Sequence, residues 1–208
     1  MASRKLVRRL AVLGITTVLP LTLMPSAHAM DAGNYYLNND WTGQCADLPG
    51  TDAVTSGTGV IQDTCLYNGS SDNQEFGLLT TRNINGTQLY EFVNVKSQLC
   101  LDLPGTGSDA PGTAVSLSTC NPNQAADNQE WYLDSFDGGL DQDLIVNYAS
   151  GECLDVKGWA SLGTATGSDW FNRQPLTIYT CSGSGSPWGG SYEDGTFWDD
   201  HVWNLQKV

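Results

Sequence analysis

The chain has 208 residues, with 23 acidic residues against nine lysines and arginines and a pI near 4.1. So acidic a surface repels phosphate backbones and anionic lipid headgroups, which excludes nucleic acid and membranes as expected partners. The length suits one domain with a single core, and the charge is accounted for by solubility.

The first 29 residues have the features of a secretory signal peptide. Four basic residues lie between positions 4 and 9, an apolar stretch follows, and Ala27-His28-Ala29 offers a small-residue cleavage site. The apolar stretch is too short for a transmembrane helix. We therefore expect residues 30–208 to be exported as a secreted, extracellular protein.

Beyond this segment, short runs rich in β-branched and aromatic residues alternate with turn residues. Examples are residues 90–95 and 144–148, and long helical periodicities are missing from the sequence. Asn85-Gly86 and Asp137-Gly138-Gly139 predict hairpin turns, because these residues tolerate a positive φ. The predicted fold class is all-β.

One phrase recurs three times: a cysteine, any residue and an aspartate, at 45–47, 100–102 and 153–155. A strand ending in asparagine precedes each copy, and a second cysteine and then an aromatic residue follow it. The asparagines are Asn38, Asn94 and Asn147, and the aromatic residues, which we expect in the core, are Phe76, Trp131 and Trp203. So regular a period indicates a fold built from three copies of one unit.

The six cysteines of an exported chain indicate disulfides, for which fifteen pairings exist. The repeat selects one pairing, with a single bond inside each unit. The predicted bonds are Cys45–Cys65, Cys100–Cys120 and Cys153–Cys181. The close cysteine pairs of a zinc site are missing, and neither a metal nor a cofactor is predicted.

The three Cys-x-Asp turns, each followed by a second cysteine and a Gln-x-Trp-like ending, resemble the ricin B-type lectin family. The endings are Gln74-Glu75-Phe76, Gln129-Glu130-Trp131 and His201-Val202-Trp203. The resemblance implies a β-trefoil over residues 30–208, with repeats at about 34–80, 88–135 and 143–208. It also implies a non-catalytic carbohydrate-binding protein, a lectin.

In that family the aspartate of Cys-x-Asp accepts hydrogen bonds from sugar hydroxyls, and an aromatic residue two positions before the second cysteine stacks on the sugar ring. An asparagine before the Gln of Gln-x-Trp makes a further polar contact, and that Gln braces the aspartate. Carboxylate and amide groups suit vicinal hydroxyls, whereas an aromatic face covers the C–H patch of a pyranose. The resemblance therefore implies up to three shallow sugar sites.

The first and second repeats lack the stacking ring, because Asp63 and Ser118 occupy that position. Their polar site residues are Asp47, Asn73 and Gln74 in the first repeat and Asp102, Asn128 and Gln129 in the second. For these two aspartates the alternative is a structural role, in which the carboxylate caps a turn and bonds the glutamine.

The third repeat has Asp155 and a stacking residue, Tyr179, with Asp200 and His201 where the family has Asn and Gln. Because stacking is hard to replace in water, this repeat is the predicted principal site. Insertions before and after Cys181 add aromatic residues that either widen the site into a groove or only cover the enlarged loops. They are Trp159, Trp170, Phe171, Trp188, Tyr192 and Trp198.

Other functions remain open at this point. The enlarged loop at 187–198 suits a β-trefoil that binds protein, such as a protease inhibitor, which needs no Asp–aromatic pair. An accessory module is the third possibility, and we expect any enzyme partner to be encoded separately. Catalysis by the chain itself is not expected, because His201 is the one histidine after residue 29 and every cysteine is assigned to a disulfide. If His201 donates to Asp155, sugar binding should change between about pH 5 and 8.

Overall fold

The computed structural model describes residues 30–67, 71–121, 127–135, 143–157, 173–181, 190–191, 197–198 and 200–208. Its strands are β1 (Gly33–Asn39), β2 (Gln44–Asp47), β3 (Ile61–Thr64), β4 (Glu75–Ile84), β5 (Thr87–Asn94), β6 (Leu99–Asp102), β7 (Ser116–Ser118), β8 (Trp131–Ser135), β9 (Asp143–Asn147), β10 (Cys153–Val156), β11 (Leu176–Tyr179), β12 (Gly190–Ser191), β13 (Phe197–Trp198) and β14 (Val202–Lys207). No helix in these ranges is long and apolar enough to cross a membrane.

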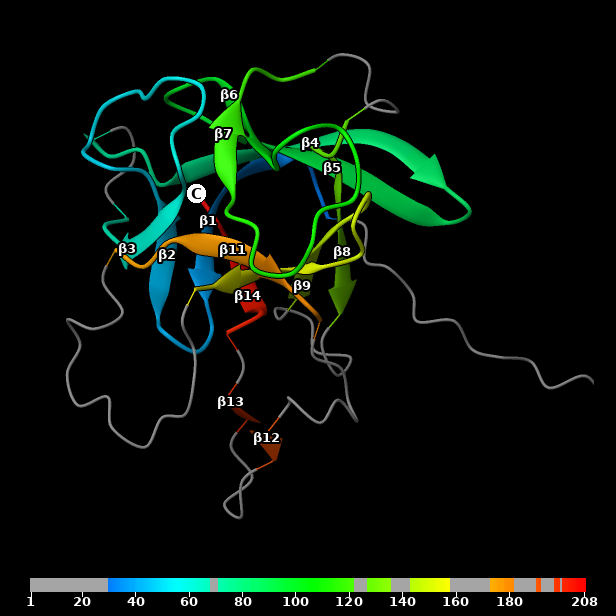
Figure 1. The fold of residues 1–208 in the computed structure, drawn as a ribbon. Helices are drawn as coiled ribbons and strands as arrows, with labels where there is room; N and C mark the ends of the chain where they lie inside the picture. The colour runs from blue at the N-terminus through cyan, green and yellow to red at the C-terminus, as the bar shows by residue number, and fades with distance from the viewer. Residues whose placement is uncertain are drawn as a thin grey trace, which may run out of the picture.

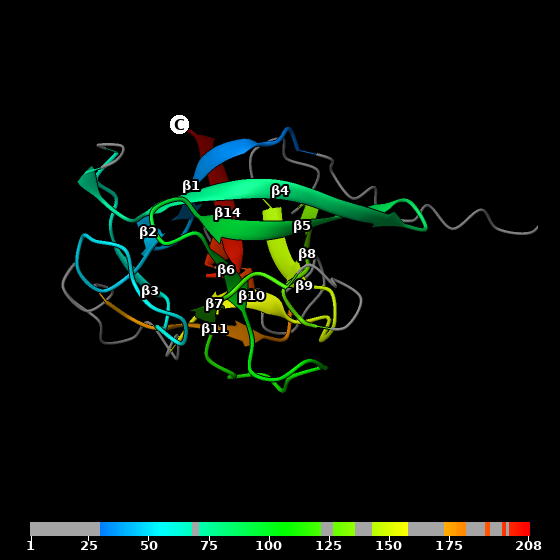
Figure 2. The same cartoon turned by 90° about the horizontal axis from the view of Figure 1, so that it is seen from above.

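Six strands close into an antiparallel barrel in the order β1, β4, β5, β8, β9, β14 and back to β1. Three hairpins, β2–β3, β6–β7 and β10–β11, lie together at one end of this barrel (Figure 2). Isolated bridges join the hairpins to one another: Gly59 to Ser116, Ile61 to Pro175 and Ala114 to Thr177. Each repeat thus contributes two barrel strands and one hairpin between them, which is a β-trefoil and confirms the predicted fold class.

The aromatic residue that ends each repeat lies in the core, as predicted. Phe76, Trp131 and Trp203 are each 0% exposed. The two indole N–H groups donate to the carbonyls of Leu101 and Leu154, at 3.2 and 3.0 Å. Each bond ties the last barrel strand of a repeat to the hairpin of the same repeat, so the aromatic ending fixes where the hairpin sits over the barrel.

Each repeat also carries its own disulfide, and the three predicted pairings are confirmed. The bonds join Cys45 to Cys65, Cys100 to Cys120 and Cys153 to Cys181, with sequence separations of 20, 20 and 28 residues. Closing a loop of this length stabilises the fold by about 3 kcal/mol per bond, chiefly by restricting the unfolded chain.

A buried asparagine braces each junction between repeats. Its side-chain amide donates to a backbone carbonyl just before the Gln-x-Trp position, joining Asn39 to Asp200, Asn94 to Asn73 and Asn147 to Asn128 at 2.7, 2.6 and 2.7 Å. The prediction of Asn38 for the first repeat was wrong by one residue, because β1 continues to Asn39. The shared bond shows that Asp200 is the third-repeat equivalent of Asn73 and Asn128.

The β4–β5 hairpin extends well beyond the rest of the barrel (Figure 1). Its turn is Asn85-Gly86, with φ values of 53° and 97°, which confirms this predicted turn. The other predicted turn, at 137–139, lies outside the described residues.

Candidate functional site

In the third repeat, the β10–β11 hairpin places an acid and an aromatic ring on one face. Asp155 lies directly opposite Thr177, and Tyr179 is two residues further along β11. Opposed residues and residues two apart in a strand share a face of the sheet. Leu154 and Ile178, both fully buried, occupy the opposite face and pack in the core. The alternation of the strand therefore presents Asp155 and Tyr179 together on the outer face.

The carboxylate of Asp155 is held by two neighbours. Its Oδ2 accepts a hydrogen bond from Thr177 Oγ1 at 2.7 Å, and its Oδ1 lies 3.4 Å from His201 Nε2. Tyr179 is 49% exposed, and the centroid of its ring lies 6.4 Å from that of the His201 ring. A fixed carboxylate thus lies beside a ring that is open to solvent.

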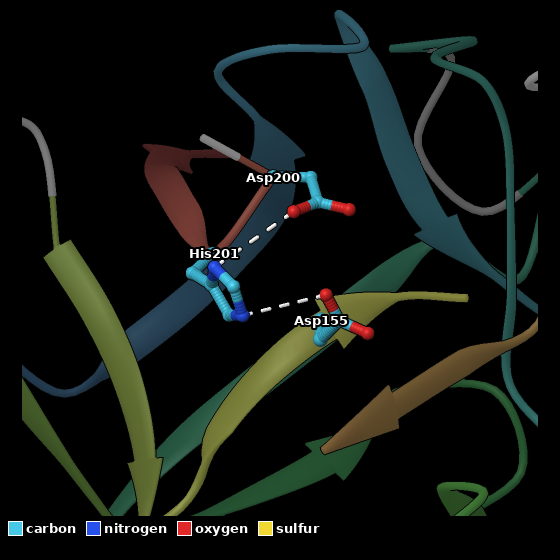
Figure 3. Close-up of side chains that lie close together, drawn as sticks. All are labelled: Asp155, Asp200 and His201. Atoms are coloured by element: carbon cyan, nitrogen blue, oxygen red, sulfur yellow. Dashed lines mark ion pairs between the residues drawn. The ribbon is translucent and has the colours of Figure 1, made fainter. Parts of the chain in front are cut away.

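His201 lies between two carboxylates, as Figure 3 shows: Nε2 faces Asp155, and Nδ1 faces Asp200 Oδ1 at 3.8 Å. All three residues are buried, and each offers one possible metal-ligand atom that lies within 4.8 Å of the other two. This spacing would allow them to hold a metal ion. Because the two ring nitrogens face different acids, only the imidazolium form can donate toward both carboxylates at once.

In the first repeat, Gln74 connects Asp47 to the segment after the second cysteine. The glutamine side chain bonds the Asp47 carboxylate, accepts from the Leu66 N–H at 2.9 Å and donates to the Thr64 carbonyl at 2.9 Å. Asp47 Oδ1 also accepts from the Leu48 N–H at 2.7 Å. Gln74 therefore links Asp47 to the backbone on either side of Cys65.

Burial raises the pKa of Asp47 to about 6. The Leu48 N–H and the Gln74 side chain act in the opposite direction, while the charges of Asp72 and Asp63 add to the rise. Burial is the largest cause, since Asp47 is 6% exposed. The carboxylate is therefore ionised at neutral pH at a cost in folding free energy.

A cavity of about 620 Å³ opens over the first repeat. Acidic, apolar and amide side chains line it together with one cation, Arg173, which belongs to the third repeat. The lining residues are Asp47, Leu48, Pro49, Gly50, Thr51, Ile61, Asp63, Thr64, Leu66, Asp72, Gln74 and Arg173. The cavity therefore joins residues of two different repeats.

The second repeat reproduces the polar arrangement of the first. The Gln129 side chain bonds Asp102, accepts from the Asn121 N–H at 2.8 Å and donates to the Thr119 carbonyl at 3.1 Å. Burial raises the pKa of Asp102, and hydrogen bonds from Gln129, Ser118 and the Leu103 N–H act in the opposite direction. The position of the stacking ring is occupied here by the hydroxyl of Ser118.

Asn73 and Asn128 direct their side-chain amides at loop backbone. Both are 1% exposed. The Asn73 amide donates to the carbonyls of Gly50 and Asp52, whereas the Asn128 amide donates to the carbonyls of Pro104 and Gly107 and to the Asp109 carboxylate. These asparagines therefore brace the loop that follows each Cys-x-Asp turn.

Sequence reasoning missed Thr177 and Arg173. Thr177 could have been found from the sequence, because antiparallel pairing of the two strands of the third-repeat hairpin, β10 and β11, places it opposite Asp155. Arg173 had none, since its contact with Asp63 spans 110 positions and two repeats. The aromatic residues of the insertions, from Trp159 to Phe171 and from Trp188 to Tyr192, lie outside the described residues, and so does the side chain of Trp198.

Solved structures with this architecture include natural lectins and a designed protein. The designed threefold-symmetric protein ThreeFoil is 24% identical, with a TM-score of 0.59 over 85% of this chain and 99% of its own. The Rhizoctonia solani agglutinin is 19% identical, with a TM-score of 0.57 over 87% and 99%. The Macrolepiota procera ricin B-like lectin, solved in complex with lactose, is 16% identical, with a TM-score of 0.55 over 87% and 99%.

Comparison with curated protein sequences gives no match. The family model of the ricin-type β-trefoil lectin domain-like proteins, in contrast, matches residues 26–118 and 72–169, which together span well over half of the chain. With the closed barrel, the three hairpins and the repeated Asp–Gln pairs, this match assigns the family. The chain belongs to the ricin-type β-trefoil lectin domain-like family.

Proposed function

We propose that the chain is a secreted, non-catalytic lectin that binds a sugar in a shallow site on its third repeat. Asp155 accepts hydrogen bonds from vicinal hydroxyls, and Tyr179 stacks on the C–H face of the same ring. His201 and Asp200 hold the Asp155 carboxylate in place. The family supports this proposal, as does the lactose complex of the Macrolepiota procera lectin.

One observation carries the choice of the third repeat. Tyr179 lies opposite Cys153 in the strand register, which is the stacking position of the third repeat. The residues at the same position in the first and second repeats are Asp63 and Ser118, and neither is aromatic. Tyr179 is half exposed, and Asp155 beside it contacts Thr177 and His201. An aromatic ring beside a carboxylate is the combination that reads both the apolar and the hydroxyl side of a pyranose.

Export is supported by the basic and apolar start of the chain and by the three disulfides, which persist in oxidising compartments. Mass spectrometry of the protein recovered from culture medium tests this part. We expect a mature chain that begins at Met30 and contains no free thiol.

A glycan array followed by isothermal titration with the sugar it identifies tests the binding site. Tyr179→Ala and Asp155→Asn should each weaken binding at least about tenfold, because each removes a contact worth roughly 1.5 kcal/mol or more. Tyr148→Ala is the matched control, since it removes another exposed ring, 41% exposed, that faces Arg82.

Sugar binding that survives both substitutions would refute the third-repeat site. Absence of any glycan binding, together with tight binding of a protein through the 187–198 loop, would instead favour the protein-binding alternative.

A further inference from the structure

The third repeat carries metal-binding side-chain types where the other two repeats carry amides. Asp200 takes the place of Asn73, because the backbone carbonyl of each accepts a hydrogen bond from a buried asparagine. His201 follows it in the place of Gln74, and the second repeat has the same two amides at 128 and 129. An amide side chain carries no charge, whereas carboxylate and imidazole groups are common ligands of Zn²⁺. This change of residue type distinguishes the third repeat from the other two.

These two side chains form a buried cluster with Asp155 (Figure 3). Asp155, Asp200 and His201 are 8%, 1% and 8% exposed. Two ionised carboxylates beside a neutral imidazole carry two negative charges, and burying charge is costly unless a partner compensates it. An imidazolium compensates one of these charges, whereas a divalent cation compensates both. The burial of the cluster therefore favours a divalent cation as its partner.

The spacing within the cluster suits a zinc ion. His201 Nε2 lies 3.4 Å from Asp155 Oδ1, and one possible ligand atom from each of the three residues lies within 4.8 Å of the other two. Bonds of about 2.0–2.1 Å in a tetrahedral zinc site separate the ligand atoms by about 3.3 Å. The His201–Asp155 pair already has this separation, and a movement of at most about 1.5 Å brings the ligand atom of Asp200 to it.

Hydrogen bonds from two other strands hold the acidic residues of the cluster. Thr177 Oγ1 on β11 donates to Asp155 Oδ2 at 2.7 Å, and Asp155 Oδ1 faces His201. The Asn39 amide at the end of β1 donates to the Asp200 carbonyl at 2.7 Å. Hydrogen bonds from outside a metal site orient its ligands and are a regular part of such sites. The cluster is therefore positioned by β1, β10 and β11 and not by its own members alone.

We propose that Asp155, Asp200 and His201 bind one Zn²⁺ ion, each through one atom. The ion connects the start of β14 to the β10–β11 hairpin, as Gln74 connects Asp47 to its surroundings in the first repeat. Three protein ligands leave a fourth coordination position for water. This inference goes beyond the proposed function, because the ion binds without a sugar.

The test uses the protein recovered from culture medium, without a histidine tag and after dialysis against EDTA. Isothermal titration with zinc chloride should show one saturable equivalent per chain. His201 is the one histidine after residue 29, so its ring signals in nuclear magnetic resonance spectra report on this site directly. They should shift in step with the calorimetric titration. Ca²⁺ should bind at least about tenfold more weakly than Zn²⁺, because an imidazole ligand favours zinc.

Two substitutions restore the amides of the other repeats and should therefore preserve the fold. Asp200→Asn and His201→Gln should each weaken zinc binding at least about tenfold, the smallest loss expected when a group of a metal site is removed. Zinc should also raise the thermal unfolding midpoint of the parent protein, because an ion that binds the folded chain stabilises it, and should not raise that of His201→Gln.

Asp102→Asn is the matched control. Asp102 is the Cys-x-Asp aspartate of the second repeat, and its carboxylate bonds Gln129 in place of a histidine. This variant should bind zinc as tightly as the parent protein does. An equal loss of zinc binding in Asp102→Asn would overturn the inference, because it would show that zinc binds to acidic side chains in general.

Zinc binding that leaves the His201 ring signals unchanged would also overturn the inference, as would full zinc affinity in both Asp200→Asn and His201→Gln. Tighter binding of Ca²⁺ than of Zn²⁺ would overturn it in favour of a site made of carboxylates alone. Failure of the proposed function gives a different pattern, in which the chain binds no glycan while zinc still shifts the His201 signals, and this outcome would support the metal site.

Discussion

The raised pKa of Asp47 predicts a specific pH dependence of stability. The carboxyl has a pKa of about 6 in the folded chain, against 3.8 for an unperturbed aspartate, mainly because folding buries it. Asp47→Asn removes the ionisation while keeping the side-chain shape and an oxygen that accepts from the Leu48 N–H, 2.7 Å away. Comparing the two proteins isolates the cost of the buried charge.

The sign follows from proton linkage. Between the two pKa values the folded chain binds more protons at Asp47 than the unfolded chain does, so stability falls as the pH rises. The stability that proton binding at Asp47 gives the folded chain is almost fully retained near pH 3, where Asp47 is protonated in both states. It is lost as the pH rises through the interval from 3.8 to about 6. Integrated from pH 4 to pH 7, the loss amounts to about 2 kcal/mol.

Urea unfolding with the disulfides intact, at pH 4, 5.5 and 7, measures the effect. We expect the free energy of unfolding of Asp47→Asn, relative to the parent protein, to increase by about 2 kcal/mol from the lowest to the highest pH. If asparagine makes weaker hydrogen bonds than aspartate, the difference in free energy of unfolding shifts by the same amount at every pH. Its change with pH is therefore unaffected. The exposed Asp31→Asn variant is the control for the loss of one acidic side chain.

A difference that stays constant with pH, or one that falls as the pH rises, would refute the reasoning. It would mean that the hydrogen bonds of Asp47 to Leu48 and Gln74 outweigh its burial.

Three further outcomes are expected. Trp203→Phe should lower the free energy of unfolding by about 1–3 kcal/mol in urea titration, because it removes the bond to the Leu154 carbonyl and leaves a small void; an unchanged midpoint would contradict this. The parent protein should bind sugar more weakly at about pH 5 than at about pH 8, because the His201 imidazolium competes with the sugar for Asp155. His201→Gln should make sugar affinity independent of pH over about the same range. The same pH dependence of affinity in both proteins would refute this prediction. Replacing both Cys100 and Cys120 by alanine should cost about 3 kcal/mol in thermal or urea unfolding, and no loss would show that this bond does not restrict the unfolded chain.

Much of the architecture could be predicted from local patterns. The spacing of the Cys-x-Asp turn and the second cysteine led to the disulfides, because each of these bonds stays within one repeat. The aromatic ending led to the buried Phe76, Trp131 and Trp203, because it recurs at the same place in each repeat. The strand-ending asparagine of the first repeat was placed one residue early, since Asn38 and Asn39 are adjacent and only their contacts distinguish them. Asn39 bonds the Asp200 carbonyl, 161 positions away.

The candidate sites show the same division. Asp155 and Tyr179 were paired from the resemblance to the lectin family, in which the stacking residue lies two positions before the second cysteine. The location of His201 between Asp155 and Asp200 depends on the closure of β14 onto β1 and β9, which brings the last repeat beside the first. Gln74 and Gln129 were predicted to brace the aspartates, but the loop carbonyls bonded by Asn73 and Asn128 depend on loop conformations that composition does not specify.

The sequence by itself determined that this protein is built from three repeats with one disulfide in each, because these features recur at a regular period and each disulfide closes within its own unit. The resemblance to the ricin B-type lectins added the β-trefoil. The tertiary structure alone decided that a cavity lies over the first repeat and that Arg173 of the third repeat closes one side of it against Asp63. The physical reason is the closure of the barrel, which juxtaposes the hairpins of different repeats. Contacts between repeats produce no repeated pattern in the sequence. The charged residues of that cavity therefore could not be predicted from any one repeat.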